Sequence, residues 1–320
     1  MSFSLHCSQL ALILPLNTKA EMNTLIVITG PTGVGKTATA IEMAQWLGCD
    51  IVNADSRQVY RDIPIGTAAP TAAEQALVHH HLVGFKALDD AYSASQFEQD
   101  VLQLLPQLWK HNKYAIMCGG SMMYVDAVCN GIDDLPDIDE KLRLDVLTQY
   151  QQRGLESVLA DLQQLDPDYY EQVDRKNPRR VIHAVEICRQ AGVPYSSLRT
   201  GMKKKRDFNT VKLGLNIERT DLFERINHRV NKMMDNGLLE EARRVEPMRH
   251  LNSLNTVGYK ELFAYFDGKM ALDVAVERIK KNTRVYAKKQ LTWLARDPDI
   301  TWCKPAEALQ TLKDILNEDK

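Results

Sequence analysis

One glycine-rich segment constrains the fold of this chain more than any other feature of its sequence. Residues 24–29 read TLIVIT, an apolar and β-branched run typical of a buried parallel strand. The run leads into GPTGVGKT at residues 30–37, and helical periodicity follows from Ala38 to Gly48. A strand, a GxxxxGK[ST] loop and a helix in this order are typical of a phosphate-binding loop. The sequence therefore predicts an anion site between a parallel strand and a helix.

The chemistry of this loop follows from its residue types. Backbone N–H groups at the start of a helix surround an anion, Lys36 adds a positive charge, and Thr37 offers a hydroxyl to Mg²⁺. The predicted phosphate-binding residues are Gly30, Pro31, Thr32, Gly33, Val34, Gly35, Lys36 and Thr37. The motif does not identify the phosphate compound. ATP is its usual ligand, but a pyrophosphate ester presents the same groups.

Further short apolar runs, each closed by polar or glycine residues, recur along the chain. They cover residues 51–54, 114–118 and 211–217, and helical stretches separate them. This alternation predicts an α/β fold, a P-loop NTPase-like core with a parallel sheet. Residues 127–200 show helical patterns without a strand, which predicts a helical insertion. Residues 22–126 and 201–320 then form the core with a helical C-terminal part, and we expect residues 1–21 to be a disordered extension.

Polar residues follow the predicted strands at the edge where open parallel sheets bind ligands. The rule selects the segments 55–58 and 119–121 together with Arg219. Asp55 could act as a general base, hold a metal ion, or begin the next segment as a helix N-cap. Arg219 could clamp a leaving pyrophosphate or form a surface ion pair with a neighbouring carboxylate.

The charge balance excludes a uniformly basic protein. Forty Lys and Arg residues face 42 Asp and Glu residues, so nucleic-acid binding would depend on local patches. Two basic segments, at residues 174–206 and 278–289, favour a polyanion partner over solvated helix faces. We expect Tyr286 and Trp293 to lie in the core.

The remaining signals point away from membranes, disulfides and metal clusters. No apolar stretch approaches the roughly 20 residues that span a bilayer. The six cysteines form no CxxC pair, which favours reduced thiols in a cytosolic protein. The spacing of His79, His80 and His81 is wrong for a shared metal ion, and we expect structural roles for them.

In combination, these motifs resemble the tRNA dimethylallyltransferase family, the adenine-37 isopentenyltransferases, in its bacterial form. The resemblance covers nearly everything from residue 22 onward, and DSRQVYR at 55–61 downstream of the phosphate loop is its most specific part. The other matching segments are IGTA at 65–68, HHL at 80–82, GGS at 119–121, RR at 179–180, VGYKE at 257–261, TR at 283–284 and QLTW at 290–293.

The resemblance implies a reaction and a role for each matching residue. A dimethylallyl group would pass from dimethylallyl diphosphate to N6 of adenine 37 of a tRNA, with Asp55 as the general base. Lys36, Arg219 and Mg²⁺ near Thr37 would stabilise the departing diphosphate, and Thr32 would bond near its bridging oxygen. The implied tRNA contacts, on the anticodon stem-loop, are Asp55, Ser56, Arg57, Gln58, Ser121, Arg143, Arg179, Arg180, Val181, Ile182 and His183.

The resemblance also implies a cytoplasmic enzyme that acts as a monomer without a membrane partner. Two other classes remain compatible with the phosphate loop. A small-molecule kinase would use ATP and an arginine-rich lid, and a non-catalytic RNA-binding NTPase would hydrolyse nucleotide. Both classes differ from a prenyltransferase in the phosphate compound that they bind.

Overall fold

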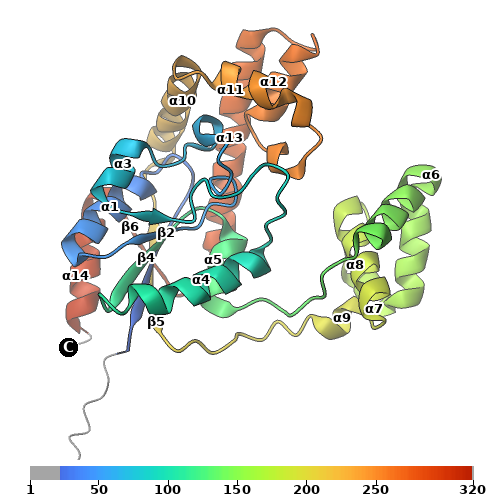
Figure 1. The fold of residues 1–320 in the computed structure, drawn as a ribbon, viewed down its shortest axis with the longest axis horizontal. Helices are drawn as coiled ribbons and strands as arrows, with labels where there is room; N and C mark the ends of the chain where they lie inside the picture. Colours follow the sequence, from blue (N-terminus) through green and yellow to red (C-terminus); the bar gives the residue numbers. More distant parts are fainter. Residues whose placement is uncertain (1–21, 319–320) are drawn as a thin grey trace, which may run out of the picture.

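The computed structural model describes residues 22–318 and is organised around a six-stranded parallel sheet (Figure 1). The predicted extension at residues 1–21 lies outside the described residues. The strand order is β3-β2-β4-β1-β5-β6, and every pairing is parallel. The strands are β1 (Thr24–Thr29), β2 (Ile51–Asn53), β3 (His80–His81), β4 (Tyr114–Cys118), β5 (Asn209–Leu215) and β6 (Ile300–Cys303).

Helices cover both faces of the sheet, as the apolar strands require. In β1, Ile26 and Ile28 pack on one face and Leu25 and Val27 on the other. The first face is covered by α1 (Lys36–Leu47) and α14 (Ala308–Glu318), and the second by α4 (Ala94–Leu108) and α5 (Met122–Asn130). This arrangement confirms the predicted α/β class with a phosphate-loop core.

A third group of helices lies beyond the carboxyl edge of the sheet, at the top of Figure 1. It consists of α10 (Arg219–Asp235), α11 (Leu238–Val245), α12 (Tyr259–Phe266) and α13 (Leu272–Leu294). These helices share an apolar cluster with the segment after β2, in which Tyr259 is completely buried against residues 59–63. The cluster fixes α10 and α13 as walls above the loops that leave the strands.

The middle of the chain forms a helical lobe with its own apolar core. Its helices are α6 (Glu140–Leu165), α7 (Pro167–Gln172), α8 (Pro178–Ala191) and α9 (Tyr195–Leu198). Helix α6 is interrupted at Gly154, whose φ is 74°. Figure 1 shows the lobe beside the core, joined to it by two extended segments. The boundary expected at residue 127 falls within α5, whose Val128 packs on the sheet.

The two segments that join the lobe to the core are tied to each other. The Asp133 carboxylate accepts hydrogen bonds from the backbone and hydroxyl of Thr200, and Lys204 contacts Asp134 at 2.7 Å. Arg206 forms a buried ion pair with Glu98 and also donates to two carbonyls near the end of α5. The basic run at residues 203–206 therefore serves largely to attach the lobe.

The strands and helices differ from the sequence prediction mainly at their ends. Strand β4 matches its predicted range, whereas β5 begins and ends two residues earlier than expected. Strands β3 and β6 were not predicted, because β3 has two residues and β6 is an edge strand whose Thr301 and Trp302 are exposed. The remaining short helices are α2 (Pro64–Thr67), α3 (Ala72–Leu77), η1 (Glu246–Met248), η2 (Asn252–Leu254) and η3 (Pro305–Glu307). Within residues 22–318, no helix combines the length and apolar character needed to cross a bilayer.

Candidate functional site

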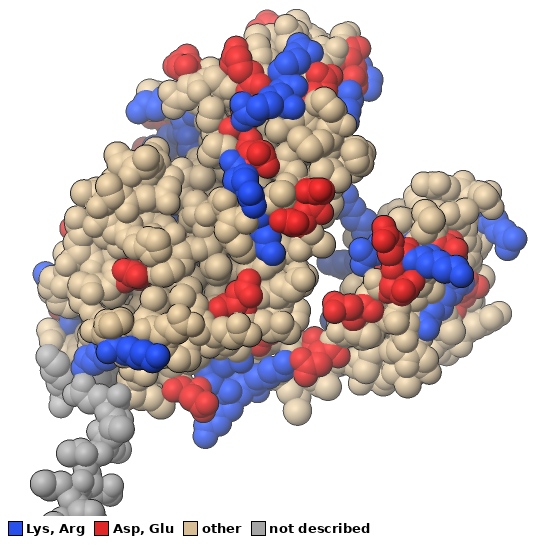
Figure 2. Space-filling model, in the orientation of Figure 1, with Lys and Arg blue, Asp and Glu red and all other residues tan. Residues whose placement is uncertain are grey.

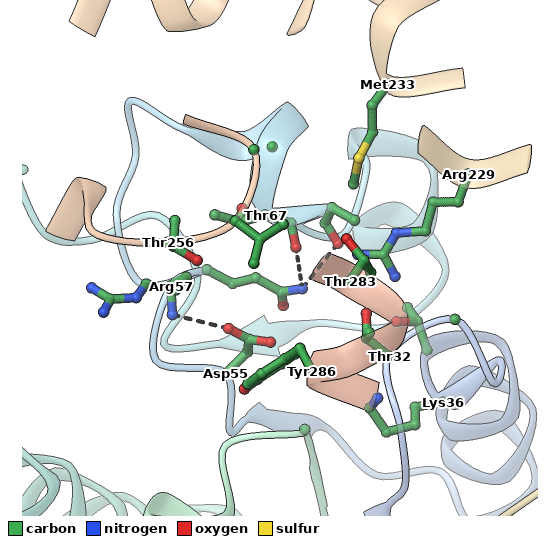
Figure 3. Close-up of a pocket in the computed structure, with 18 of the residues that line it drawn as sticks. Thr32, Lys36, Asp55, Arg57, Thr67, Arg229, Met233, Thr256, Thr283 and Tyr286 are labelled. Atoms are coloured by element: carbon green, nitrogen blue, oxygen red, sulfur yellow. Dashed lines mark hydrogen bonds between the residues drawn. The ribbon is translucent and has the colours of Figure 1, made fainter. Parts of the chain in front are cut away.

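A cavity of about 600 Å³ lies at the carboxyl edge of the sheet, where the strand-end rule places a ligand. The phosphate loop and the turn after β2 line one part of it, and α10 and α13 line another (Figure 3). The helical contributions are Ile226, Arg229, Val230 and Met233 from α10 and Ile279, Thr283, Tyr286 and Gln290 from α13. Residues from distant parts of the sequence thus surround a single site.

Glycines allow the phosphate loop to adopt its shape. Gly30, Gly33 and Gly35 have φ values of 145°, 86° and 113°, which side-chain-bearing residues rarely adopt. A Cβ on Gly30 would lie 2.6 Å from the carbonyl oxygen of Leu215, so β5 packs directly against the loop. Of the eight predicted residues, those that line the cavity are Thr32, Gly33, Gly35, Lys36 and Thr37. Val34 is completely buried and anchors the loop to the core.

The Lys36 ammonium group lies against the phosphate loop and is enclosed by it. Its Nζ donates hydrogen bonds to the carbonyls of Gly30 and Pro31, both at 3.0 Å. Burial lowers the pKa of Lys36 to about 8, although the nearby Cys118 thiol and Asp55 carboxylate act in the opposite direction. A partly buried, poorly solvated cation next to the backbone N–H groups of the loop attracts a phosphate group strongly.

Asp55 projects into the cavity from the turn after β2 (Figure 3). Its Oδ1 accepts a hydrogen bond of 2.9 Å from the backbone N–H of Arg57. This bond closes a turn and no helix begins there, so the N-cap interpretation is wrong. Within residues 22–318, the second carboxylate oxygen makes no hydrogen bond to protein. Asp55 is therefore held in orientation by one oxygen and retains the other for a ligand.

The residues after Asp55 are braced by their neighbours. The backbone N–H of Ser56 donates to Oγ of Ser121 at 2.8 Å, and Arg57 Nη1 donates to the carbonyls of Asn252 and Ser253. Gln58 Nε2 donates to the carbonyls that end α2, at 3.1 and 2.9 Å. Ser56, Arg57 and Gln58 line the cavity. Ser121 does not line it and instead holds the segment through its hydrogen bond to Ser56.

Arg219, the cation predicted at the end of β5, does not line the cavity. Strand β5 ends at Leu215, so Arg219 begins α10, where it is exposed and stacks on the Phe223 ring at 5.2 Å. Arg229 lies ten residues farther along α10, which corresponds to about 15 Å along a helix. Arg229 is the cation of α10 that lines the cavity; burial lowers its pKa, and the Asp55 carboxylate opposes that shift. A repeat of three and four residues along one helix face, from Ile226 to Met233, could have identified it.

The aromatic residues of α13 do not occupy the core as predicted. Tyr286 and Trp293 are 40% and 41% exposed, and the buried positions of the helix go to smaller residues such as Ala287. Tyr286 lies beside Asp55 in the cavity (Figure 3). Burial of its hydroxyl raises the pKa of Tyr286 to about 12, so the phenol stays protonated at neutral pH. Trp293 lies at the surface, with the guanidinium of Arg296 5.7 Å from its ring.

A metal ion at this site would be held by oxygen donors near the phosphate loop. Within residues 22–318 there is no cluster of three or more His, Cys, Asp or Glu side chains that could hold a metal ion. His81 pairs with Asp50 at 2.9 Å, and His80 bonds the carbonyl of Val78, which agrees with structural roles. Thr37 lines the cavity. A hydroxyl of this kind suits Mg²⁺, which binds through few protein groups, retained waters and phosphate oxygens.

The predicted RNA contacts of the helical lobe divide into exposed and buried residues. Arg179 and Arg180 are exposed in the first turn of α8. Arg143 and His183 both approach the buried Glu186 carboxylate, at 3.9 and 3.7 Å. The other two predicted residues, Val181 and Ile182, are buried in the core of the lobe, so their side chains cannot contact RNA.

Both a protein-family model and solved structures are similar to this chain over most of its length. The family model described as IPP transferase matches residues 58–297. The tRNA dimethylallyltransferase 2 of Parabacteroides distasonis is 57% identical over 286 residues, or 89% of this chain and 96% of the relative. The tRNA dimethylallyltransferase 1 of Phocaeicola vulgatus is 52% identical over 293 residues, or 92% and 98% of the two chains.

Two solved structures share the fold over most of this chain. One is the full-length tRNA isopentenylpyrophosphate transferase from Bacillus halodurans, with 32% identity, a TM-score of 0.67, and coverage of 92% and 96% of the two chains. The other is a eukaryotic dimethylallyltransferase described as acting on tRNA, with 27% identity and a TM-score of 0.75. That likeness covers 88% of this chain and 74% of the eukaryotic one.

The lowered pKa of Lys36 predicts how anion binding depends on pH. A bound anion stabilises the charged ammonium, so it raises this pKa above about 8. The affinity for inorganic pyrophosphate should therefore weaken as the pH rises through about 8, by up to about tenfold per pH unit. Calorimetric titrations between about pH 6.5 and pH 9.5 measure this. Lys36→Met, studied in parallel, corrects for titration of the ligand; an equal pH dependence in both proteins would contradict the assignment.

Proposed function

Since the chain belongs to the IPP transferase family, we propose that it transfers the dimethylallyl group from dimethylallyl diphosphate to N6 of adenine 37 of tRNAs. The products are N6-isopentenyladenosine and diphosphate. The observation that carries the proposal is that Lys36, Arg229 and Asp55 line one cavity, so cations for a leaving group and a carboxylate base share a site. The identity of over 50% to proteins named tRNA dimethylallyltransferase supports the same reaction.

The donor binds with its diphosphate in the phosphate loop. The backbone N–H groups of Gly33, Gly35, Lys36 and Thr37 and the two cations Lys36 and Arg229 surround the phosphate oxygens. Their charges lie in a poorly solvated site, so they stabilise the negative charge that develops on the leaving diphosphate. The hydroxyl of Thr32 bonds near the bridging oxygen. Arg229 thus takes the role that the sequence assigned to Arg219.

Magnesium fits the loop through the hydroxyl of Thr37. When bound there, Mg²⁺ supplies further positive charge to the diphosphate oxygens. The Thr37 hydroxyl would be the oxygen with which the phosphate loop holds the ion. Such a site needs no cluster of His, Cys or carboxylate side chains, and residues 22–318 contain none.

The acceptor amine reacts on the side of the cavity that Asp55 occupies. The nitrogen N6 attacks the allylic carbon, the bond from that carbon to the diphosphate oxygen breaks, and the bonding electrons leave with the diphosphate. The free oxygen of Asp55 takes the proton that N6 loses. An exocyclic amine is a weak nucleophile, so the alignment of N6 with the allylic carbon matters as much as the base.

The anticodon stem-loop binds between the core and the helical lobe. Figure 2 shows positively charged side chains on the part of the lobe that faces the core. Arg143, Arg179, Arg180 and His183 contact the RNA backbone, while the buried Val181 and Ile182 hold α8 in place. The adenine leaves its stack to enter the cavity, where the segment from Asp55 to Gln58 reads its edge. We propose that the enzyme works as a monomer in the cytoplasm, where tRNA is found.

The two arginines of α10 give a matched test of the diphosphate site. Arg229→Gln removes a partly buried cation beside the leaving group, so kcat should fall by about 10²–10³-fold. Arg219→Gln removes an exposed cation on the same helix and should change kcat by less than about threefold. Steady-state transfer of label from dimethylallyl diphosphate to an anticodon stem-loop measures both. A larger loss for Arg219→Gln would restore the assignment made from the sequence.

The reaction itself is tested with the same RNA and with Asp55→Asn. Label should enter an anticodon stem-loop that carries adenine at position 37 and should not enter the same RNA with guanine there. Because Asp55→Asn keeps the size of the side chain and loses the base, transfer should slow by about 10²–10⁴-fold. RNA affinity, measured by filter binding, should stay within about threefold. Hydrolysis of ATP without transfer would instead favour a kinase or an NTPase.

A further inference from the structure

Gln290 is a buried amide at the point where α13 meets the phosphate loop. Its side chain is 2% exposed, although its neighbours on the buried face of the helix are apolar, such as Ala287 and Leu294. Its Oε1 accepts a hydrogen bond from the backbone N–H of Thr32 at 2.8 Å. Its Nε2 donates to the carbonyl of Gly120 at 2.9 Å. One side chain therefore joins the loops that follow β1 and β4.

The backbone at Gly120 leaves just enough space for the Gln290 amide. A Cβ on Gly120 would lie 2.4 Å from Nε2 of Gln290 and 3.4 Å from Nζ of Lys36. The loop after β4 therefore packs directly against both side chains. An amide of fixed length between two backbone groups keeps the phosphate loop at a set distance from α13.

The hydrogen bond between Thr32 and Gln290 limits which backbone N–H groups can bind the diphosphate. The Thr32 N–H is already satisfied by Gln290, so the N–H groups available to a ligand are those farther along the loop. The same bond holds the backbone of Thr32 and thereby the position from which its hydroxyl enters the cavity. Thr32 lines the cavity with Lys36, on the donor side of the site (Figure 3).

Helix α13 also reaches the acceptor side. Tyr286 precedes Gln290 by four residues, which is about one helical turn, and it lies beside Asp55 (Figure 3). The acceptor side and the donor side of the cavity are therefore connected through one rigid turn of helix. A shift of Gln290 would change the distance between the leaving group and the attacking amine.

We propose that Gln290 is a positioning residue, which holds Thr32 so that the allylic carbon of the bound donor faces the amine beside Asp55. This inference rests on the proposed transfer reaction. Gln290 acts through Thr32 and does not touch the reacting atoms. It should therefore affect the rate of the chemical step more than the binding of RNA.

The test replaces Gln290 by Met, which has a similar length and makes neither hydrogen bond. We expect kcat for transfer to the stem-loop to fall about tenfold or more, with RNA affinity within about twofold of wild type. Gln290→Asn keeps the amide but is one methylene too short to span both partners. It should therefore also lower kcat. Ala275→Gly is the control for destabilised α13, because it lies four turns away from Gln290.

A double-mutant cycle separates positioning from a merely structural role. Thr32→Val removes the hydroxyl and keeps the backbone N–H that Gln290 binds. If Gln290 acts by orienting that hydroxyl, the double variant should be no slower than Thr32→Val alone. Losses that multiply, or a Gln290→Met enzyme as fast as Ala275→Gly, would overturn the inference. Absence of transfer by the wild-type protein would instead contradict the proposed function, so the two failures are distinguishable.

Discussion

Close contact between the backbones of loops at one edge of a parallel sheet is the constraint on which this site depends. A Cβ on Gly119 would lie 2.1 Å from the carbonyl oxygen of Ala54, and one on Gly30 would lie 2.6 Å from that of Leu215. The loops after β1, β2 and β4 and the end of β5 can approach this closely only because side chains are absent there. Their approach brings the phosphate loop next to the turn that carries Asp55.

The charged side chains of the cavity distinguish the part that binds the donor from the part that binds the acceptor. Lys36 and Arg229 are both buried enough for their pKa values to fall, and the Asp55 carboxylate partly offsets this in each case. Before a ligand binds, two poorly solvated cations, Lys36 and Arg229, thus lie in the cavity near the Asp55 carboxylate; Arg57, Lys260 and Glu74 also line it. A diphosphate relieves the desolvation of the cations, whereas a neutral amine can approach the carboxylate. The separation of donor and acceptor follows from this division of charge.

The part of the site that could be predicted from the sequence is the part that local patterns encode. The phosphate loop and Asp55 each follow a strand, so a strand-end rule locates both. Arg229, Tyr286 and Gln290 lie within helices, and their access to the cavity depends on how α10 and α13 pack across the sheet edge. The apolar run extends β5 to residue 217 and so selects Arg219, whereas β5 ends at Leu215 and the cavity is reached farther along α10, at Arg229.

On this mechanism, the phosphate loop holds the diphosphate of an allylic donor and not a nucleotide. The most direct measurement is the thermal unfolding midpoint with dimethylallyl diphosphate or with ATP, each with Mg²⁺ and at matched concentrations. A ligand present at about 100 times its dissociation constant stabilises the folded protein by about 2.7 kcal/mol. We expect dimethylallyl diphosphate to raise the midpoint in the wild type and much less in Arg229→Gln. A rise with ATP alone, and none with dimethylallyl diphosphate, would contradict the account.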